Sequence, residues 1–309
     1  MSKENTAVTK KKMKRCKEDV VFDAACFIIL TLVLFVVAYP LYWVIISSIS
    51  APSAVSSGKV LLHPIGFTLK GYAEVFKNDQ VMRGFLNSLI ITFCGVMVNL
   101  IVTLPTSYAL SRSNFSGKKP ITIFYLITMF FSGGLIPTYL VIQKLQMLNT
   151  IWALILPGCL SVYNMIVART FFKSNISEEL YEAAEIDGCT QARFFFQIAL
   201  PLSKAIIAIL VLYYGVGHWN SYFSALVYIS DKAKYPLQLV LRNILITNQT
   251  ALSQTATTAA ARAALQEKQQ LIDVMKYSLI IISSIPVLVM YPLVQKHFVK
   301  GVMIGSMKG

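Results

Sequence analysis

The residues best suited to polar chemistry lie in one short stretch, EELYEAAEIDGCTQARFFFQIALPLSK, at positions 178–204. The 309-residue chain has only 14 Asp and Glu, and this stretch contains Glu178, Glu179, Glu182, Glu185 and Asp187. Carboxylates on a short helix can form charge-assisted hydrogen bonds with Lys or Arg of another surface. The alternative is a linker helix on the membrane surface, but such helices usually carry Lys and Arg on their polar face. The stretch therefore predicts a docking element.

Local features around these carboxylates predict a helix, a turn and a second helix. Ser177 can cap the first helix, acidic residues suit its first turn, and Gly188 suits its end. Thr190 can begin the second helix, which Pro201 should interrupt. A spacing of three and four residues predicts that one side of the first helix holds Leu180, Ala183, Ala184 and Asp187. The small alanines on this side would let a partner approach closely.

The composition of the chain is that of a membrane protein. Hydrophobic residues make up 56% and charged residues 14%, whereas a soluble domain is about a quarter charged. A hydrocarbon core about 30 Å thick requires roughly 20 apolar helical residues. Six charge-free windows are long enough: 24–50, 84–111, 120–143, 145–168, 205–230 and 277–295. A seventh, 243–261, is too polar to span and is predicted to be a loop.

We therefore expect an all-α polytopic membrane protein with six transmembrane helices, in which a basic segment, 1–20, precedes one domain, 21–309. Six basic residues between positions 10 and 17 predict a cytoplasmic N-terminus. Six crossings then place the C-terminus, the 111–119 loop and the 174–204 insert in the cytoplasm, and loops 51–83 and 231–276 outside. The first window is longer than the apolar core of a signal peptide, which predicts an uncleaved helix.

Several classes of protein are disfavoured. The six windows contain no Asp, Glu, Lys or Arg, although ion-coupled carriers need such groups inside the membrane. His218, in the fifth window, is interpreted as a hydrogen-bonded packing residue. Phosphate-loop, HExxH and GxSxG motifs are absent, and the five cysteines lack metal-type spacing. Basic residues flank apolar spans, which argues against nucleic acid. We predict a chain that is not an enzyme, binds no cofactor or metal, and receives energy from another polypeptide.

The insert resembles the EAA loop of permease subunits in binding-protein-dependent ABC importers. The matching positions are Glu182, Ala183, Ala184, Gly188, Ile198, Leu200 and Pro201. The sequences ARTFF before the loop and EIDG within it resemble the carbohydrate branch, the MalG-like subunits. GVGHWNSYFSALVYISD, YPLQLVLRNILI and YPLVQKHFVKGVMIGSMKG resemble the LplC/YtcP-type subunits, which serve oligosaccharides from complex polysaccharides. The resemblance covers nearly the whole chain after about residue 20.

This resemblance implies a type I ABC importer permease fold in the bacterial plasma membrane. It implies a second homologous permease subunit, two cytosolic ATPase subunits that hold ATP and Mg, and an extracytoplasmic solute-binding lipoprotein. The EAA loop would sit in a groove of the ATPase, whose closure would move the permeases between inward and outward states. The coupling residues would be Glu182, Ala183, Ala184, Asp187, Gly188, Ile198, Leu200 and Pro201. The tail, 295–309, would also touch the ATPase, and the outer segment 247–276 would contact the binding protein or serve as a connector.

The resemblance also implies an oligosaccharide substrate, derived from pectin, rhamnogalacturonan or another plant glycan. Sugars bind to aromatic faces and neutral hydrogen-bonding groups. The candidate substrate-path residues are Trp219, Asn220, Tyr222, Phe223 and Asn87. Trp219 and Tyr222 could equally be packing or interfacial residues. Two alternatives remain: an ABC importer for a non-sugar solute such as peptides, and a membrane receptor or assembly factor that transports nothing.

Overall fold

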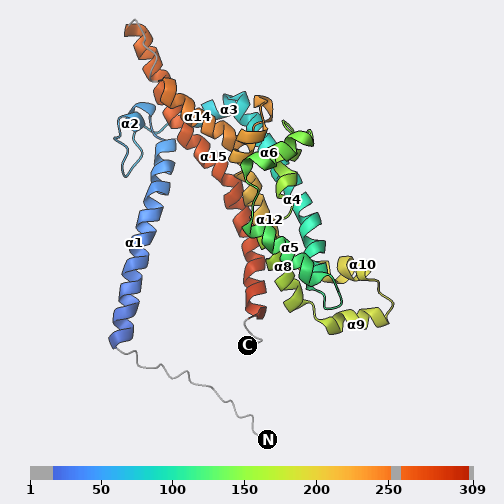
Figure 1. The fold of residues 1–309 in the computed structure, drawn as a ribbon. Coiled ribbons are helices and arrows are strands. Elements are labelled where there is room, and N and C mark those ends of the chain that lie inside the picture. Colours follow the sequence, from blue (N-terminus) through green and yellow to red (C-terminus); the bar gives the residue numbers. More distant parts are fainter. Residues whose placement is uncertain (1–16, 252–258, 306–309) are drawn as a thin grey trace.

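The computed structural model describes residues 17–251 and 259–305, in which every regular element is a helix (Figure 1). The predicted all-α class is confirmed. The longest elements are α1 (Lys17–Ser48), α4 (Asp79–Ser111) and α15 (Ala259–Gly305). The Asn78 side chain begins α4 by accepting hydrogen bonds from two backbone N–H groups of its first turn, which would otherwise lack partners.

Shorter elements connect these three helices. They are α2 (Pro52–Ser56), α3 (Lys70–Lys77), α5 (Lys118–Phe130), α6 (Leu135–Lys144), α7 (Trp152–Ile155), η1 (Leu156–Gly158), α8 (Val162–Asn175), α9 (Glu178–Ile186), α10 (Gln191–Phe194), the π-helical η2 (Phe195–Ala199), α11 (Leu200–Leu202), α12 (Lys204–Trp219), α13 (Tyr222–Tyr228), η3 (Lys232–Lys234) and α14 (Leu237–Ala251).

Three of the helices are long and apolar enough to cross a membrane unbroken, at Glu18–Ser48, Asp79–Ser111 and Gln269–Pro292. Three helix pairs pass the same test together but are bent at a short break. The bends are 114° between Lys118–Phe130 and Leu135–Lys144, 52° between Trp152–Gly158 and Val162–Asn175, and 80° between Gln191–Leu202 and Lys204–Trp219. The described residues therefore contain up to six spans, and the count of six stays a prediction.

Two of these bends, and a separate break after Trp219, correct three of the predicted windows, because each window was expected to be one continuous helix. In the third window α5 ends at Phe130, and α6 begins only after Gly134, whose φ is +86°, a conformation that glycine adopts readily. The fourth window begins with turns, in which Gln146 and Asn149 have φ of +55° and +61°, and becomes helical only at Trp152. The fifth window is interrupted after Trp219. A window of apolar residues shows that a segment can be buried in lipid, but not that it is straight.

The predicted loop at 243–261 is wrong over much of its length. Residues up to Ala251 continue α14, and residues from Ala259 onward belong to α15; residues 252–258 lie outside the described part. Polarity excludes this segment from the membrane, but alanine and glutamine still favour helix. A polar sequence can therefore be helical without spanning.

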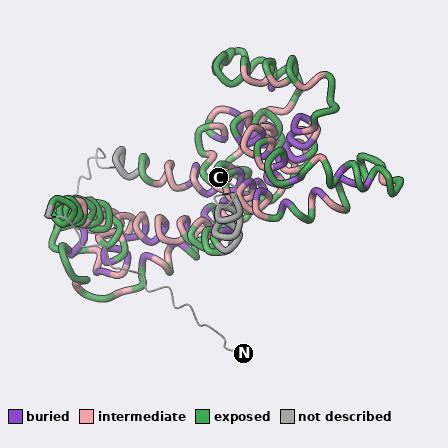
Figure 2. Tube along the Cα trace, turned by 90° about the horizontal axis from the view of Figure 1, so that it is seen from below, coloured by how far each residue is buried: buried purple, intermediate pink, exposed green. Residues whose placement is uncertain are grey.

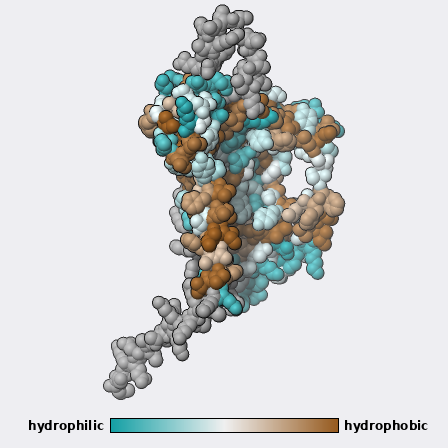
Figure 3. All heavy atoms as spheres, turned by 90° about the vertical axis from the view of Figure 1, so that its left-hand side faces the viewer, coloured by the Kyte–Doolittle hydropathy of each residue, from teal (hydrophilic) through white to brown (hydrophobic). Residues whose placement is uncertain are grey.

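The buried core lies where α4 packs against α8 and α12, and α15 crosses α12. Figure 2 shows buried residues gathered where these helices meet, whereas the body of α1 is exposed. Exposed apolar side chains run along α1 from Val20 to Tyr42. In Figure 3, hydrophobic side chains gather along the middle of the face seen, with hydrophilic ones toward its ends. This distribution suits a molecule whose middle is surrounded by lipid.

The two ends of the molecule contain the loops that the predicted topology groups together. In Figure 1 the start of α1, the helices α9 and α10 and the end of α15 lie toward one end. The helices α2 and α3, with the end of α14 and the start of α15, lie toward the other. We call these the α9 end and the α3 end. Loop 51–83 and the described parts of loop 231–276, which are 231–251 and 259–276, thus share the α3 end, away from the acidic insert.

Candidate functional site

The acidic insert forms the predicted helix, turn and helix. The Ser177 side chain accepts a hydrogen bond from the Leu180 backbone N–H at 3.3 Å, and this caps α9. The Thr190 side chain accepts one from the Arg193 N–H at 3.4 Å, and this caps α10. Side-chain caps of this kind satisfy backbone donors that the helix itself leaves unpaired. Both predicted caps are confirmed.

Gly188 makes the turn between the two helices. Its φ is +76°, and its backbone N–H donates to the Glu185 carbonyl oxygen at 2.9 Å. The next residue, Cys189, donates to the Ala184 carbonyl oxygen, also at 2.9 Å. A Cβ added at Gly188 would meet nothing within 4 Å. The position thus requires a left-handed backbone conformation, and space does not limit it.

We expect Gly188→Val to weaken association of the insert with its partner, whereas Gly188→Asn should leave it nearly normal. The left-handed conformation costs an L-residue about 1–2 kcal/mol, but asparagine adopts it more readily. The measurement is recovery of a tagged ATPase with each permease variant. Equal recovery with valine and asparagine would show that the turn geometry does not matter.

The second helix differs from the prediction at Pro201. Helical structure passes through Pro201 and ends at Leu202, because a π-helical segment, η2, precedes α11. A π-bulge widens the hydrogen-bonding register, which accommodates a residue without an N–H. The break comes at Ser203, where the chain bends by 80° into α12. Ile198 and Leu200 pack against the buried core, whereas Pro201 is exposed.

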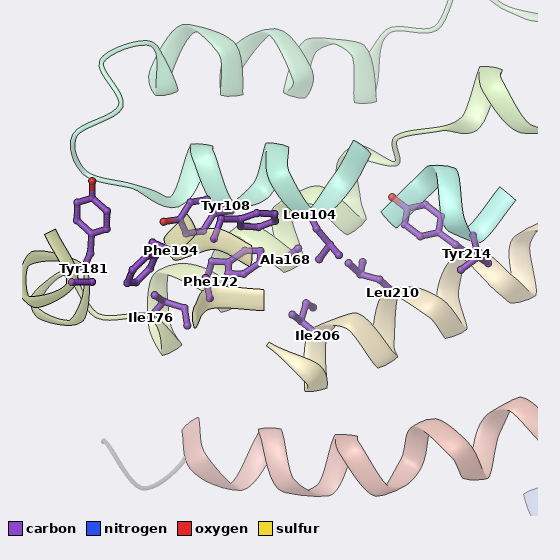
Figure 4. Packing of buried hydrophobic residues seen from close by; sticks show 14 residues of the cluster. Leu104, Tyr108, Ala168, Phe172, Ile176, Tyr181, Phe194, Ile206, Leu210 and Tyr214 are labelled. Carbon is purple, nitrogen blue, oxygen red and sulfur yellow. The ribbon is translucent and has the colours of Figure 1, made fainter. Parts of the chain in front are cut away.

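One side of α9 packs into the protein. Tyr181 and Ala184 are 6% and 9% exposed, and the Tyr181 ring packs edge-on to Phe194 with centroids 5.2 Å apart. Figure 4 shows Tyr181 and Phe194 in one cluster with Tyr108 and Phe172, from α9, α10, α4 and α8. The expectation that Ala184 seats directly against a partner is therefore corrected. Its small side chain instead lets α9 lie close to its own core.

The opposite side of α9 is open. Successive residues turn by about 100° around a helix, so the side facing away from Tyr181 and Ala184 holds Glu179, Glu182, Ala183 and Ile186. All four are exposed, and Ile186 is 86% exposed. We call this side the α9 open face. It replaces the predicted face of Leu180, Ala183, Ala184 and Asp187. Sequence reasoning missed Ile186. The signal that could have revealed it is a large apolar side chain at the end of a helix that is otherwise acidic.

The five carboxylates of the insert have two different roles. Glu178 lies 3.7 Å from an Arg112 guanidinium nitrogen and also accepts a hydrogen bond from the Ser113 backbone. The other four carboxylates are those of Glu179, Glu182, Glu185 and Asp187. None of these four forms an ion pair with another of the described residues. Exposed carboxylates without internal partners leave their charge available to another surface.

Two of the predicted substrate-path residues have their polar atoms engaged within the chain. Trp219 is 2% exposed, and its indole N–H donates to the Ser283 carbonyl oxygen at 2.9 Å. Its ring packs edge-on to Phe85. Asn87 donates to the carbonyl oxygens of Ala233 and Tyr235 at 2.8 and 3.1 Å. These contacts give Trp219 and Asn87 structural roles.

The other three candidates lie in a more open region. Asn220 is exposed and donates to the Val216 carbonyl oxygen at 3.0 Å. Tyr222 and Phe223, at the start of α13, are 44% and 52% exposed. Their rings are therefore available to a ligand or to a neighbouring subunit.

A polar row on α4 was missed by sequence reasoning. Asn99 accepts a hydrogen bond from His218 at 2.7 Å and donates to the Gly158 carbonyl oxygen at 2.7 Å. One turn on, Thr103 and Tyr214 share a hydrogen bond of 2.7 Å. The interpretation of His218 as a hydrogen-bonded packing residue is confirmed. The four-residue spacing of Asn99, Thr103, Ser107 and Ser111 is the pattern that could have revealed this row.

Known proteins resemble this chain over most of its length. LplC of Bacillus subtilis (strain 168) is 38% identical over 297 residues, covering 96% of this chain and 98% of that protein. The polygalacturonan/rhamnogalacturonan transport system permease protein YtcP of the same organism is 36% identical over 288 residues, covering 93% and 98%. The galactooligosaccharides transport system permease protein GanQ, also from that organism, is 30% identical over 294 residues, covering 92% and 94%. No protein-family model matches the chain.

A solved structure shows the same fold. It is a chain of a bacterial ABC transporter involved in the import of the acidic polysaccharide alginate, with a TM-score of 0.82 and 27% identity. The similarity covers 92% of this chain and 99% of that one. Identity above 30% over nearly complete lengths, together with this fold, establishes the relationship. The chain is a multi-pass membrane protein that belongs to the family of sugar ABC-transporter permease subunits.

Proposed function

We propose that this chain is the permease subunit of an ATP-driven importer for oligosaccharides from pectin or rhamnogalacturonan-type polysaccharides, and that α9 docks on a separate ATPase. In this proposal the α9 end faces the cytoplasm of a bacterium, together with both chain termini. The chain pairs with a second, homologous permease, two ATPase subunits and an external solute-binding lipoprotein. The observation that carries the proposal is the α9 open face.

The open face suits a groove with an apolar floor and a basic rim. Ile186 offers an apolar side chain that is 86% exposed, and apolar anchors surrounded by polar contacts typically supply most of the binding energy at interfaces. Glu179 and Glu182 beside it can pair with Lys or Arg at the rim. Ala183 between them lets the groove come close. Glu182, Ala183 and Gly188 thus keep the coupling roles that the family resemblance implies.

The packing of α9 supports a role in coupling. Tyr181 and Ala184 join α9 to a core that also includes residues of α4, α8, α10 and α12. Packed helices move as rigid bodies more readily than they deform. A displacement of α9 by an ATPase would therefore be passed to the spans, which is what alternating access requires.

The relatives suggest the kind of substrate. The name of YtcP specifies polygalacturonan and rhamnogalacturonan, and the solved structure belongs to a transporter involved in the import of alginate. Galacturonate and alginate units both carry carboxylates, so we favour an acidic oligosaccharide. We propose that Tyr222 and Phe223 present aromatic faces to the sugar, with Asn220 beside them as a hydrogen-bonding group. Trp219 and Asn87 contribute by holding the surrounding helices in place.

The test is ATP-dependent uptake by the purified complex in proteoliposomes with its binding protein. The probes are oligogalacturonides, rhamnogalacturonan oligosaccharides, neutral galactooligosaccharides and a peptide mixture. We expect a loaded binding protein to stimulate ATP hydrolysis, and the acidic oligosaccharides to accumulate inside the vesicles.

Accumulation of the neutral sugars alone would correct the substrate class but leave ATP-driven import intact. Accumulation of peptides alone would contradict the sugar assignment. A complex that neither hydrolyses ATP nor moves any probe would support the receptor or assembly-factor alternative.

A further inference from the structure

Arg112 lies at the junction between α4, the longest of the unbroken candidate spans, and the α9 insert. It follows directly after α4, and its side chain is 11% exposed. The guanidinium carbon is 5.1 Å from the centre of the Tyr108 ring, within the range of a cation–π contact. One terminal nitrogen donates to the Ile176 carbonyl oxygen at 3.0 Å. The other lies 3.7 Å from a Glu178 carboxylate oxygen.

Glu178 completes the connection from the side of α9. Its second carboxylate oxygen accepts a hydrogen bond from the Ser113 backbone N–H at 3.1 Å. One carboxylate at the first residue of α9 thus contacts two consecutive residues at the end of α4. Together with the Ile176 carbonyl, these contacts join segments 64 and 65 residues apart in the sequence. We call Arg112, Ser113, Ile176 and Glu178 the α4–α9 latch.

The surroundings of the latch are loosely filled. A cleft of about 310 Å³ opens beside Arg112 and Tyr108, and its other walls include Phe195 and Phe196 of η2. The Tyr108 ring of α4 and the Phe195 ring of η2 are in contact, with centroids 5.0 Å apart, and the cleft opens beside this contact. Because a rigid link requires continuous contact, the polar contacts of the latch reinforce the aromatic packing on this side.

Beyond the latch, α4 contacts two other helices, α8 and α12. The Tyr108 ring, in the last turn of α4, packs edge-on to Phe172 of α8 with ring centroids 5.6 Å apart. Farther along α4, Asn99 is joined to His218 of α12. Movement delivered to the end of α4 would therefore reach both α8 and α12.

We propose that Arg112 is a positioning residue that transmits movement of α9 to α4, acting through Glu178 and the Ile176 carbonyl. This inference rests on the proposed ATP-driven function. A permease without the latch still assembles with its ATPase, because the α9 open face is untouched. It loses part of the link between ATP hydrolysis and transport, because the packing of Tyr181 and Ala184 then joins α9 to the core without the latch.

The experiment compares Arg112→Ala and the nearly isosteric Glu178→Gln with Arg169→Ala in the complete complex. Arg169→Ala is a matched control. Arg169 of α8 donates to the Leu110 carbonyl oxygen at 3.0 Å, a similar cation-to-carbonyl contact at the same end of α4 that does not involve α9, and the packing of Tyr108 on Phe172 remains without it. The first measurement is the number of sugar molecules imported per ATP hydrolysed, using the acidic or neutral oligosaccharide that the wild-type complex accumulates. We expect this ratio to fall about tenfold for Arg112→Ala, within the range typical of coupling between distant sites, and to stay unchanged for Arg169→Ala.

The second measurement is the spread of distances between spin labels at Leu180→Cys in α9, outside the open face, and Ile101→Cys in α4, after replacement of the native cysteines. Both positions are exposed, at 38% and 66%. The distribution should broaden with Arg112→Ala and Glu178→Gln but not with Arg169→Ala. A general loss of folding would instead broaden all three and remove the ATPase from the complex.

An unchanged transport ratio or an unchanged distance distribution in Arg112→Ala would each overturn the latch. Loss of the ATPase from the Arg112→Ala complex would overturn it too, since the residue would then serve assembly. If the wild-type complex imports no sugar, the proposed function fails, and the latch fails with it. If the wild-type imports sugar and Arg112→Ala does so equally well, only the latch fails.

Discussion

Glu182→Lys should abolish recovery of the ATPase with the permease, and sugar uptake with it, while membrane insertion stays normal. Glu182 is exposed on the α9 open face, and its carboxylate forms no ion pair with another of the described residues. Loss of one partner of a buried charged pair at an interface costs about 2–5 kcal/mol. Since 1.4 kcal/mol is a factor of ten in affinity, we expect at least about a tenfold fall in ATPase recovery.

The control is Glu74→Lys on α3, which makes the same change in net charge at the opposite end of the molecule. Glu74 forms only an exposed pair with Lys77 at 3.2 Å, and such pairs contribute little. Membrane fractionation checks the insertion of both variants. Normal ATPase recovery and uptake with Glu182→Lys would remove the α9 open face as the docking surface.

Gly95→Ala should destabilise the permease at the contact between α4 and α12. A Cβ at this position would lie 2.5 Å from Nε2 of His218 and 2.6 and 2.7 Å from two of its ring carbons. The His218 ring cannot move aside freely, because its Nε2 is hydrogen-bonded to Oδ1 of Asn99 at 2.7 Å. Overpacking of this kind costs about 1–3 kcal/mol. The measurement is the thermal unfolding temperature of the purified complex, together with its transport rate.

Gly217→Ala provides a matched control one residue before His218. A Cβ there would meet nothing within 4 Å, so the variant should be as stable as the wild type or slightly more stable. The double variant Gly95→Ala, His218→Ala removes the clashing ring. Its loss of stability should therefore be smaller than the sum of the losses in the two single variants. Equal unfolding temperatures for Gly95→Ala and Gly217→Ala would contradict the close packing of α4 on His218.

The features predictable from sequence are those that depend on neighbouring residues. The length of apolar windows indicated a membrane protein, and Ser177, Thr190 and Gly188 marked the caps and the turn of the insert. Each of these features is local, because a cap or a left-handed glycine acts within a few residues. The family resemblance rests on the same short motifs. The sequence determined the class, the insert and the family by itself.

The tertiary structure decided which surfaces remain free. The carboxylate of Glu178 and that of Glu182 look alike in the sequence, yet Glu178 contacts Arg112 and Glu182 is exposed. Ala184 was expected to face a partner, and the sequence left Trp219 open between the sugar path and packing; both residues lie in the core. Contacts between residues far apart in the chain set these outcomes, because burial depends on how helices pack together and not on local composition.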